Sequence, residues 1–265
     1  NLVQKKMSRI WTRPTHSTIY ILMKLQTSNN KIILSDVVFD RKYNYKELQR
    51  NDEEIRTYSV KDKKVPSVTT ILSATQSKEK QQALQQWRER VGKDEASRIT
   101  KQASTRGTEM HYVLEQYLNG VGYLNLSEKG ELARTMAHTV IDNMSDINII
   151  YGTEVNLEYK QKWAGTCDLV CESNGVLTLG DFKQSNKPKR EEWITDYYYQ
   201  IAAYALAHDL HFGEIQRGLI LICTPQLVFQ KFIMGKDLLD EYKDRWLARV
   251  EKYYYNIESY NRLNF

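Results

Sequence analysis

Two aspartates and a lysine stand in the segment GTCDLVCESNGVLTLGDFKQS, residues 165–185, which otherwise has the apolar character of buried β-strands. Asn174 and Gly175 at its centre predict a two-residue hairpin turn, because both residue types tolerate positive φ. Counting back from that turn places Asp168 opposite Asp181 on one face, with Cβ atoms roughly 4.5–5.5 Å apart. A bulge that shifts the register by one residue would instead send the two carboxylates to opposite faces.

Facing carboxylates repel each other, and a divalent cation compensates this repulsion most directly, because hard cations prefer carboxylate oxygens. Lys183 is expected beside Asp181, since side chains alternate along a strand and Phe182 then points into the opposite core. A plain ion pair is the alternative, although desolvation makes such a pair a poor source of stability. A cation held by two aspartates, with a lysine to orient or deprotonate a bound water, suits phosphodiester hydrolysis.

The elements that must position these residues follow from periodicity and turn signals. Strands or a hairpin are expected before Pro66, which precedes Ser67 or Thr69 as a helix cap. The remaining expected elements are helices at 78–104 and 105–120, strands over 149–183, a helix at 191–208, strands over 216–233 and a last helix ending near residue 255. This order predicts an α/β (α+β) fold, a mixed β-sheet flanked by helices.

Composition narrows the function classes. The chain has 265 residues, enough for one large domain or two small ones, and no apolar run reaches the roughly 18 residues of a membrane span. Three cysteines without a C-x-x-C pair suggest neither a disulfide framework nor a zinc finger, and favour a reducing compartment. A net charge of +5 permits a polyanionic partner.

Further short motifs surround the aspartates and the lysine. In chain order they are VPSVTTIL, LQQWRERVG, RGTEMHYVLE, TEVNLEY, GTCD, DFKQS and QIAAY. This set resembles the RecB-like branch of the PD-(D/E)xK nuclease superfamily, and within it the mitochondrial genome-maintenance exonucleases and their phage-encoded relatives. The resemblance covers roughly residues 55–255 and implies a restriction-endonuclease-like core.

The resemblance implies a Mg²⁺- or Mn²⁺-dependent DNA exonuclease that acts on single strands or DNA ends in replication, recombination or repair. Asp168, Asp181 and Lys183 would be catalytic, and the metal ligands would be His111, Asp168, Asp181 and the backbone carbonyl of Phe182. Gln184 departs from the threonine usual in the family, which puts only a minor contact near Lys183 in doubt.

The resemblance also assigns supporting residues. The resemblance places Glu154 and Glu158 on the first core strand and retains Ser185 after the lysine. It also matches Gln200 and Tyr204 to the family's Q-x-x-x-Y motif on a helix. Either glutamate could instead face solvent. Gln200 and Tyr204 share a helix face and hold the substrate or the lysine, unless they are only the polar edge of a packed helix.

The neighbours of His111, the basic tract after Lys183 and Trp87 each have a functional and a structural interpretation. Glu115 shares a helix face with His111, and Gly107 one turn earlier would allow close backbone approach. A lone helical histidine is usually a surface or core residue, so the ligand role depends on these neighbours. The basic tract 183–190 contributes Lys187 and Arg190 as phosphate contacts, or is a solvated loop. Trp87 offers a stacking surface with Arg88 and Arg90 beside it, or packs in the core.

Domain organisation is predicted as one nuclease domain, residues 31–265, with a helical part at about 66–145 and a catalytic core at about 146–257. Residues 1–30 are basic and free of acids, as in an organellar presequence or in translated sequence upstream of Met7 or Met23. The second interpretation is favoured, with disorder in this lead. A cytoplasmic location, in a phage host or a bacterium, is expected, and a mitochondrial one is the alternative.

Two alternative activities stay open. A structure-specific or restriction-type endonuclease could use the same core. A retaining glycosidase also pairs carboxylates about 5 Å apart, but Lys183 and the basic charge oppose it. The absence of a complete phosphate-loop motif predicts no nucleotide cofactor, three cysteines cannot hold a four-cysteine iron–sulfur cluster, and no membrane partner is expected.

Overall fold

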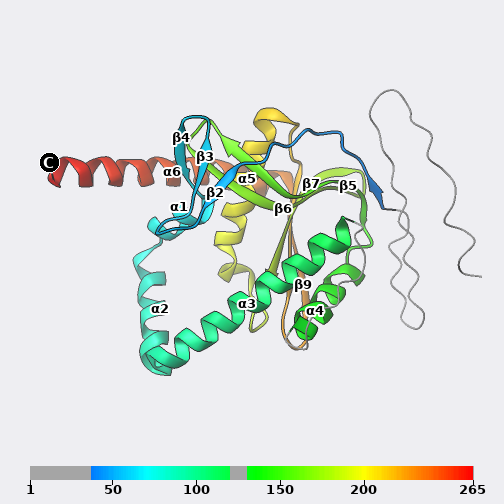
Figure 1. Cartoon of the computed structure of the whole chain (residues 1–265), viewed down its shortest axis with the longest axis horizontal. Helices are drawn as coiled ribbons and strands as arrows, with labels where there is room; N and C mark the ends of the chain where they lie inside the picture. Colours follow the sequence, from blue (N-terminus) through cyan, green and yellow to red (C-terminus); the bar gives the residue numbers. More distant parts are fainter. Residues whose placement is uncertain (1–36, 120–129, 265) are drawn as a thin grey trace, which may run out of the picture.

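A mixed six-stranded sheet forms the centre of the computed structural model, which describes residues 37–119 and 130–264 (Figure 1). Its spatial order is β1-β5-β6-β7-β8-β9, with parallel pairing of β1 to β5 and of β7 to β8 and antiparallel pairing elsewhere. The strands are β1 Val38–Phe39, β5 Ile147–Tyr159, β6 Trp163–Ser173, β7 Val176–Gln184, β8 Arg217–Cys223 and β9 Phe229–Met234. The basic lead expected at 1–30 lies outside the described residues.

Helices cover both faces of this sheet, as the sequence predicts. Helices α1 (Val68–Ala74), α5 (Thr195–His211) and α6 (Lys236–Asn264) bury their apolar side chains in one core. Helices α3 (Lys93–Leu118) and α4 (Glu131–Asp142) pack against the other face, where α3 runs along the sheet with α4 beside it (Figure 1). None of the helices among the described residues is long and apolar enough to cross a membrane.

A second, three-stranded sheet stands next to α1. It consists of β2 (Gln49–Asn51), β3 (Thr57–Val60) and β4 (Lys63–Pro66), paired antiparallel in that order. The hairpin before Pro66 and the cap at Ser67 are as predicted, because the Ser67 side chain accepts a hydrogen bond from the Thr70 amide. The short strand β2 has no strand signal in its sequence, QRN, and it forms only by pairing with β3.

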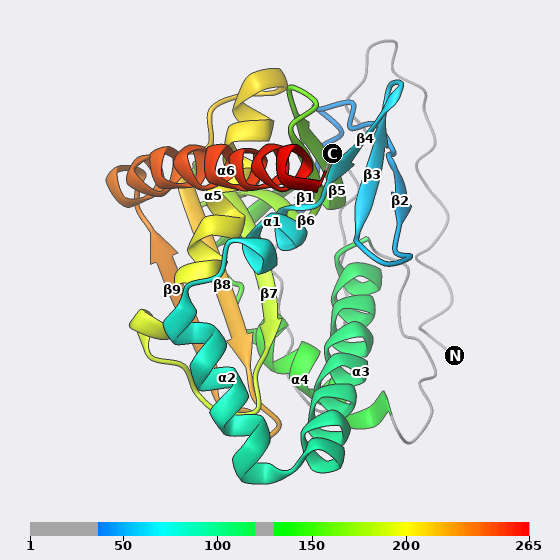
Figure 2. The same ribbon diagram turned by 90° about the vertical axis from the view of Figure 1, so that its left-hand side faces the viewer.

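Helices α2 (Lys78–Val91) and α3 meet at Gly92 like the two arms of a V (Figure 2). Gly92 has φ +86°, a conformation that favours glycine, so the chain turns there. The prediction of one helix over 78–104 and a second over 105–120 is therefore wrong about the position of the break. Gly107 is accommodated inside α3, and α2 buries none of its side chains, in keeping with its polar sequence.

The Asn174-Gly175 hairpin between β6 and β7 forms in the predicted register. Ser173 pairs with Val176, and the pairing continues in the same register to its last pair, Leu169 with Gly180. Beyond that pair β6 continues along β5 as far as Trp163, while β7 continues along β8 as far as Gln184. The sheet therefore forks between β6 and β7, directly at the two aspartates.

Candidate active site

Asp168 lies where β6 and β7 separate. Its Oδ2 atom accepts a hydrogen bond of 2.7 Å from the backbone amide of Phe182 on β7. The Asp168 side chain thus bonds to β7 where backbone pairing between β6 and β7 has ended. Asp168 and Asp181, predicted from the turn to be directly opposed, are not paired in the sheet. The reason is that Asp181 and Phe182 pair with β8 on the other side, so β7 follows β8 and leaves β6.

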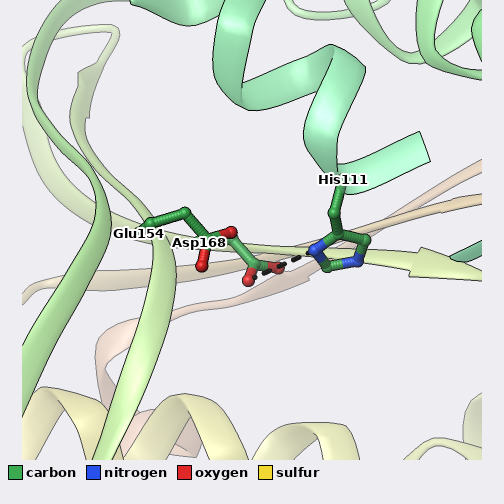
Figure 3. Close-up of side chains that lie close together, drawn as sticks. All are labelled: His111, Glu154 and Asp168. Carbon is green, nitrogen blue, oxygen red and sulfur yellow. Dashed lines mark ion pairs between the residues drawn. The ribbon is translucent and has the colours of Figure 1, made fainter. Parts of the chain in front are cut away.

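Three side chains from three elements converge at this fork (Figure 3). His111 comes from α3, Glu154 from β5 and Asp168 from β6, and one potential ligand atom of each lies within 4.8 Å of the others. His111 Nδ1 is 3.5 Å from Asp168 Oδ1, and the imidazole meets the Phe182 ring edge to face at a centroid distance of 6.2 Å. An imidazole and two carboxylates are a donor set that could hold a divalent metal ion.

Glu154 reaches the cluster through an irregularity of β5. Two register shifts between Ile147 and Gly152 insert extra residues into β5 relative to β6. Thr153 then pairs with Leu169 and Val155 with Cys167, which places Glu154 beside Asp168. Glu154 itself has a φ of +48°. The sequence pattern could not decide whether Glu154 faces inward or outward. The only feature of the sequence that pointed to a role for Glu154 at the site was its position in the TEVNLEY motif.

Asp181 and Lys183 form a buried ion pair on β7. Lys183 Nζ donates to Asp181 Oδ1 at 2.6 Å and lies 2.5 Å from Oδ2. The same ammonium stands 5.3 Å from the centroid of the Tyr197 ring of α5. Phe182, between the two, packs in the opposite core with α3 and α4, so the predicted alternation of side chains is confirmed.

Burial and neighbouring charges shift the titration of the cluster. Burial would lower the pKa of His111, but the Asp168 carboxylate raises it to about 9. Burial would raise the pKa of Asp168, but His111 outweighs it and keeps that pKa low. Burial and the adjacent Asp168 raise the pKa of Glu154 to about 7. Burial likewise raises the pKa of Asp181 to about 6, against the influence of Lys183.

A cleft of about 590 Å³ opens over the fork. His111, Glu154 and Asp168, which we call the acidic cluster, line one side together with Lys183 and Gln184. Glu115 joins them from α3, one turn beyond His111. The small sheet and α1 contribute the other side. The lining residues there are Arg50, Arg56, Tyr58, Ser67 and Thr69.

Two of the predicted supporting residues, Tyr204 and Ser185, are buried. Tyr204 is buried on α5, lines the cleft and packs so closely on Gly165 that a Cβ there would lie 2.6 Å from Tyr204 Cε1. Ser185 is buried and donates its hydroxyl to the carbonyl of Lys187, which fixes the loop after β7. Gln200 has a buried Oε1 without a hydrogen-bond partner among the described residues, and it is not among those lining the cleft.

The other predicted contacts do not line this cleft. Lys187 and Arg190 are exposed on the loop after β7, where Arg190 stacks over the ring of Trp193. Trp87 is half-buried on α2 and belongs to none of the apolar cores, while Arg88 lines a separate cleft of about 670 Å³ between α2 and α3. Glu158 accepts the backbone amide of Gln161 instead of joining the cluster.

The residues present fit a divalent cation. His111, Glu154 and Asp168 supply nitrogen and carboxylate donors of the type that binds Mg²⁺ or Mn²⁺. Asp181 on β7 is a further buried carboxylate at the fork, and both of its oxygens lie next to the Lys183 ammonium, at 2.6 and 2.5 Å. The predicted set of His111, Asp168, Asp181 and the Phe182 carbonyl omits Glu154, which the structure places with His111 and Asp168.

Comparison with known proteins gives three similar sequences and no matching family model. All three are named Mitochondrial genome maintenance exonuclease 1. The Homo sapiens protein is 28% identical over 199 residues, the Mus musculus protein 29% over 199, and the Xenopus tropicalis protein 28% over 201. These matches cover 71% of this chain and confirm the resemblance to these exonucleases predicted from its motifs.

The chain spans 58% of the human relative's length, 59% of the mouse relative's and 57% of the frog relative's. Among solved structures, one from Eubacterium rectale aligns over 57% of this chain and 64% of its own, with 18% identity and a TM-score of 0.39. A second aligns over 72% and 78%, with 14% identity and a TM-score of 0.35.

Proposed function

We propose that the chain is a Mg²⁺- or Mn²⁺-dependent DNA exonuclease that hydrolyses phosphodiester bonds in single strands or at DNA ends. The observation that carries this proposal is the convergence of an imidazole, two carboxylates and a buried carboxylate–lysine pair at one fork of the sheet. The exonuclease name of the three relatives supports it independently. DNA replication, recombination or repair is the proposed setting.

In this mechanism His111, Glu154 and Asp168 would hold the metal ion, and Asp181, which is paired with Lys183 on β7, would be a further ligand. The bound ion would polarise a phosphoryl oxygen and lower the pKa of a coordinated water. Asp168 also fixes the end of β7 through the Phe182 amide, so it both supplies a ligand and positions the strand that carries the lysine.

Lys183 orients the attacking water and offsets the negative charge that develops on the phosphoryl group. Asp181 raises the pKa of Lys183 against the effect of burial, so the side chain stays an ammonium at neutral pH. In that form it donates hydrogen bonds and stabilises charge, and it does not act as the base. Tyr197 restricts the ammonium from the side of α5.

The proposed partner is DNA, single-stranded or with free ends. Lys187, Arg190, Trp87 and Arg88 lie outside the central cleft, and their role in DNA binding stays a prediction. The names of the relatives fit the mitochondrial alternative for the location, and the cytoplasmic location also stays a prediction.

Digestion of labelled linear and circular DNA, each single- and double-stranded, tests this function. Linear single strands should shorten from an end in Mg²⁺ or Mn²⁺, while circles persist and a chelator stops the reaction. Rapid cutting of circles would instead show an endonuclease on the same core. Activity that persists in the chelator would refute the metal mechanism.

Variants test the assignment of the ion pair. Asp181→Asn and Lys183→Ala should abolish digestion while the protein stays folded. Lys243→Ala is the matched control, because Lys243 also forms a largely buried ion pair, 2.7 Å from Asp209, away from the cleft. This control should keep its activity at temperatures where it is folded.

A further inference from the structure

We propose that Arg50 and Arg56, joined by Asp52, form a phosphate clamp that binds the DNA backbone on the wall of the cleft facing the acidic cluster. We call these three residues the arginine clamp. The inference rests on the proposed nuclease function and names the group that receives the substrate strand.

One carboxylate connects the two guanidinium groups. Arg50 Nε donates to Asp52 Oδ2 at 2.8 Å, with Nη2 at 2.7 Å from the same oxygen, and Arg56 Nε donates to Oδ1 at 2.5 Å. The arginine clamp carries one net positive charge. Within the described part of the chain, neither Nη atom of Arg56 has a hydrogen-bond partner, so that fork of donors is free for a ligand.

The backbone that carries the arginine clamp is held firmly. The carbonyl of Arg56 accepts hydrogen bonds from the Ser67 amide at 3.0 Å and from the Thr70 hydroxyl at 2.8 Å, which fix it to the first turn of α1. Tyr58, two residues on, bonds to Thr166 of β6 at 3.0 Å. The segment is therefore anchored to the strand that also carries Asp168.

Stability alone does not account for this arrangement. The Arg50 and Arg56 side chains are 49% and 45% exposed, and ion pairs between exposed side chains contribute little to stability. Both nevertheless line the same cleft as Glu115, Glu154 and Asp168.

The charge pattern of the cleft fits a nucleic-acid strand. Its acidic wall suits a metal ion and repels phosphates, whereas guanidinium groups attract phosphates and bind them through paired N–H donors. A strand lying between the two walls would have one phosphate at the metal donors and a neighbouring phosphate at the arginine clamp. Contacts of this kind position the strand without reading its sequence.

Binding of a fluorescein-labelled single-stranded DNA, measured by anisotropy in a chelator at several salt concentrations, tests the arginine clamp. Arg50→Gln and Arg56→Gln should each weaken binding roughly 3- to 10-fold and reduce the slope of log K against log salt by about 0.7. Arg50→Lys and Arg56→Lys should keep the slope and lose part of the affinity, because lysine retains the charge and lacks the planar fork.

Arg245→Gln on α6 is the control, because Arg245 is 51% exposed, pairs with Glu241 at 2.5 Å and lies outside the cleft. It should bind DNA like the parent protein. The clamp is refuted if the glutamine variants of Arg50 and Arg56 match Arg245→Gln in affinity and salt slope while the parent binds DNA. A parent that binds through these arginines and cleaves nothing would overturn the proposed hydrolysis and leave the clamp standing. A parent that does neither would overturn both.

Discussion

Glu154 and Asp168 show how a folded chain can bring together two acids that disfavour each other. Glu154 adopts a φ of +48° and is held next to a second carboxylate in a partly buried site. Backbone strain of this kind costs free energy and persists where the surrounding structure enforces it, often at functional sites. Burial and the neighbouring Asp168 also raise the pKa of Glu154 to about 7.

Replacing Glu154 by Gln should therefore separate stability from function. Loss of a metal ligand should weaken Mn²⁺ binding and DNA digestion roughly 10- to 100-fold or more. The melting temperature in a chelator at pH 8 should rise. A carboxyl whose pKa is raised by folding destabilises the native state once pH exceeds its unfolded value near 4.3, and Gln removes that charge.

Glu158→Gln is the matched control on the same strand. Glu158 accepts the Gln161 amide and lies 3.6 Å from His211, outside the acidic cluster. Its replacement should leave Mn²⁺ affinity unchanged. Equal effects of the two substitutions on Mn²⁺ binding would contradict the assignment of Glu154 as a ligand.

At the scale of the elements, the two-residue turn and the fork have different origins. Asn174 and Gly175 have φ angles of +49° and +75°, as the predicted turn requires, so a local steric rule sets the register as far as Leu169. The fork depends on β7 pairing with β8, a partner more than 30 residues later in the chain. Turn chemistry could not reveal it.

The glycine of the G-x-x-D motif has a packing role that can be tested. Gly165→Ala would place Cβ 2.6 Å from Cε1 and 3.2 Å from the hydroxyl of Tyr204, a buried side chain that would have to shift. Overpacking of this kind typically costs 1–3 kcal/mol, so we expect about that loss in the free energy of unfolding. Denaturant titration measures it.

Gly107→Ala provides the contrasting substitution. Its Cβ would lie 3.9 Å from Gln184 Cβ, an ordinary contact, and alanine favours a helix interior over glycine by up to about 1 kcal/mol. This variant should be more stable than the parent. The packing argument fails if both alanine variants change stability in the same direction.

At the scale of the whole molecule, Asp146 links segments far apart in the sequence. Its carboxylate accepts the Ser173 hydroxyl at the end of β6 and the Lys231 ammonium of β9, both at 2.6 Å. Its carbonyl accepts the Asn174 amide of the hairpin turn at 2.9 Å. Burial alone would raise the pKa of Asp146, but the hydrogen bonds from Lys231 and Ser173 outweigh it and lower that pKa.

A lowered folded-state pKa means that the stabilisation is present above the ordinary aspartate pKa near 4 and is lost as pH falls through the folded value. Asp146→Asn should lower the free energy of unfolding by about 1–2 kcal/mol at pH 7, and by progressively less toward pH 3. Thermal melts across that range measure the difference. Asp62→Asn, in the exposed β3–β4 turn, should show no such trend, and a constant deficit for Asp146→Asn would contradict the linkage.

The amino-acid sequence is enough to predict the features that depend on near neighbours along the chain. These are the hairpin register, the alternation that places Asp181 and Lys183 together and Phe182 apart, the cap at Ser67, and the helix face shared by His111 and Glu115. Each follows from local backbone geometry, because turn type, strand alternation and helical periodicity act over a few residues.

Contacts between distant segments set which further residues complete the site, and the sequence does not predict them. The inward position of Glu154 depends on bulges in β5, the fork depends on β8, and the arginine clamp depends on β2 pairing with β3 beside β6. Such contacts close loops of tens of residues, and their free energy comes from packing of the assembled layers. Short-range sequence rules do not contain that information.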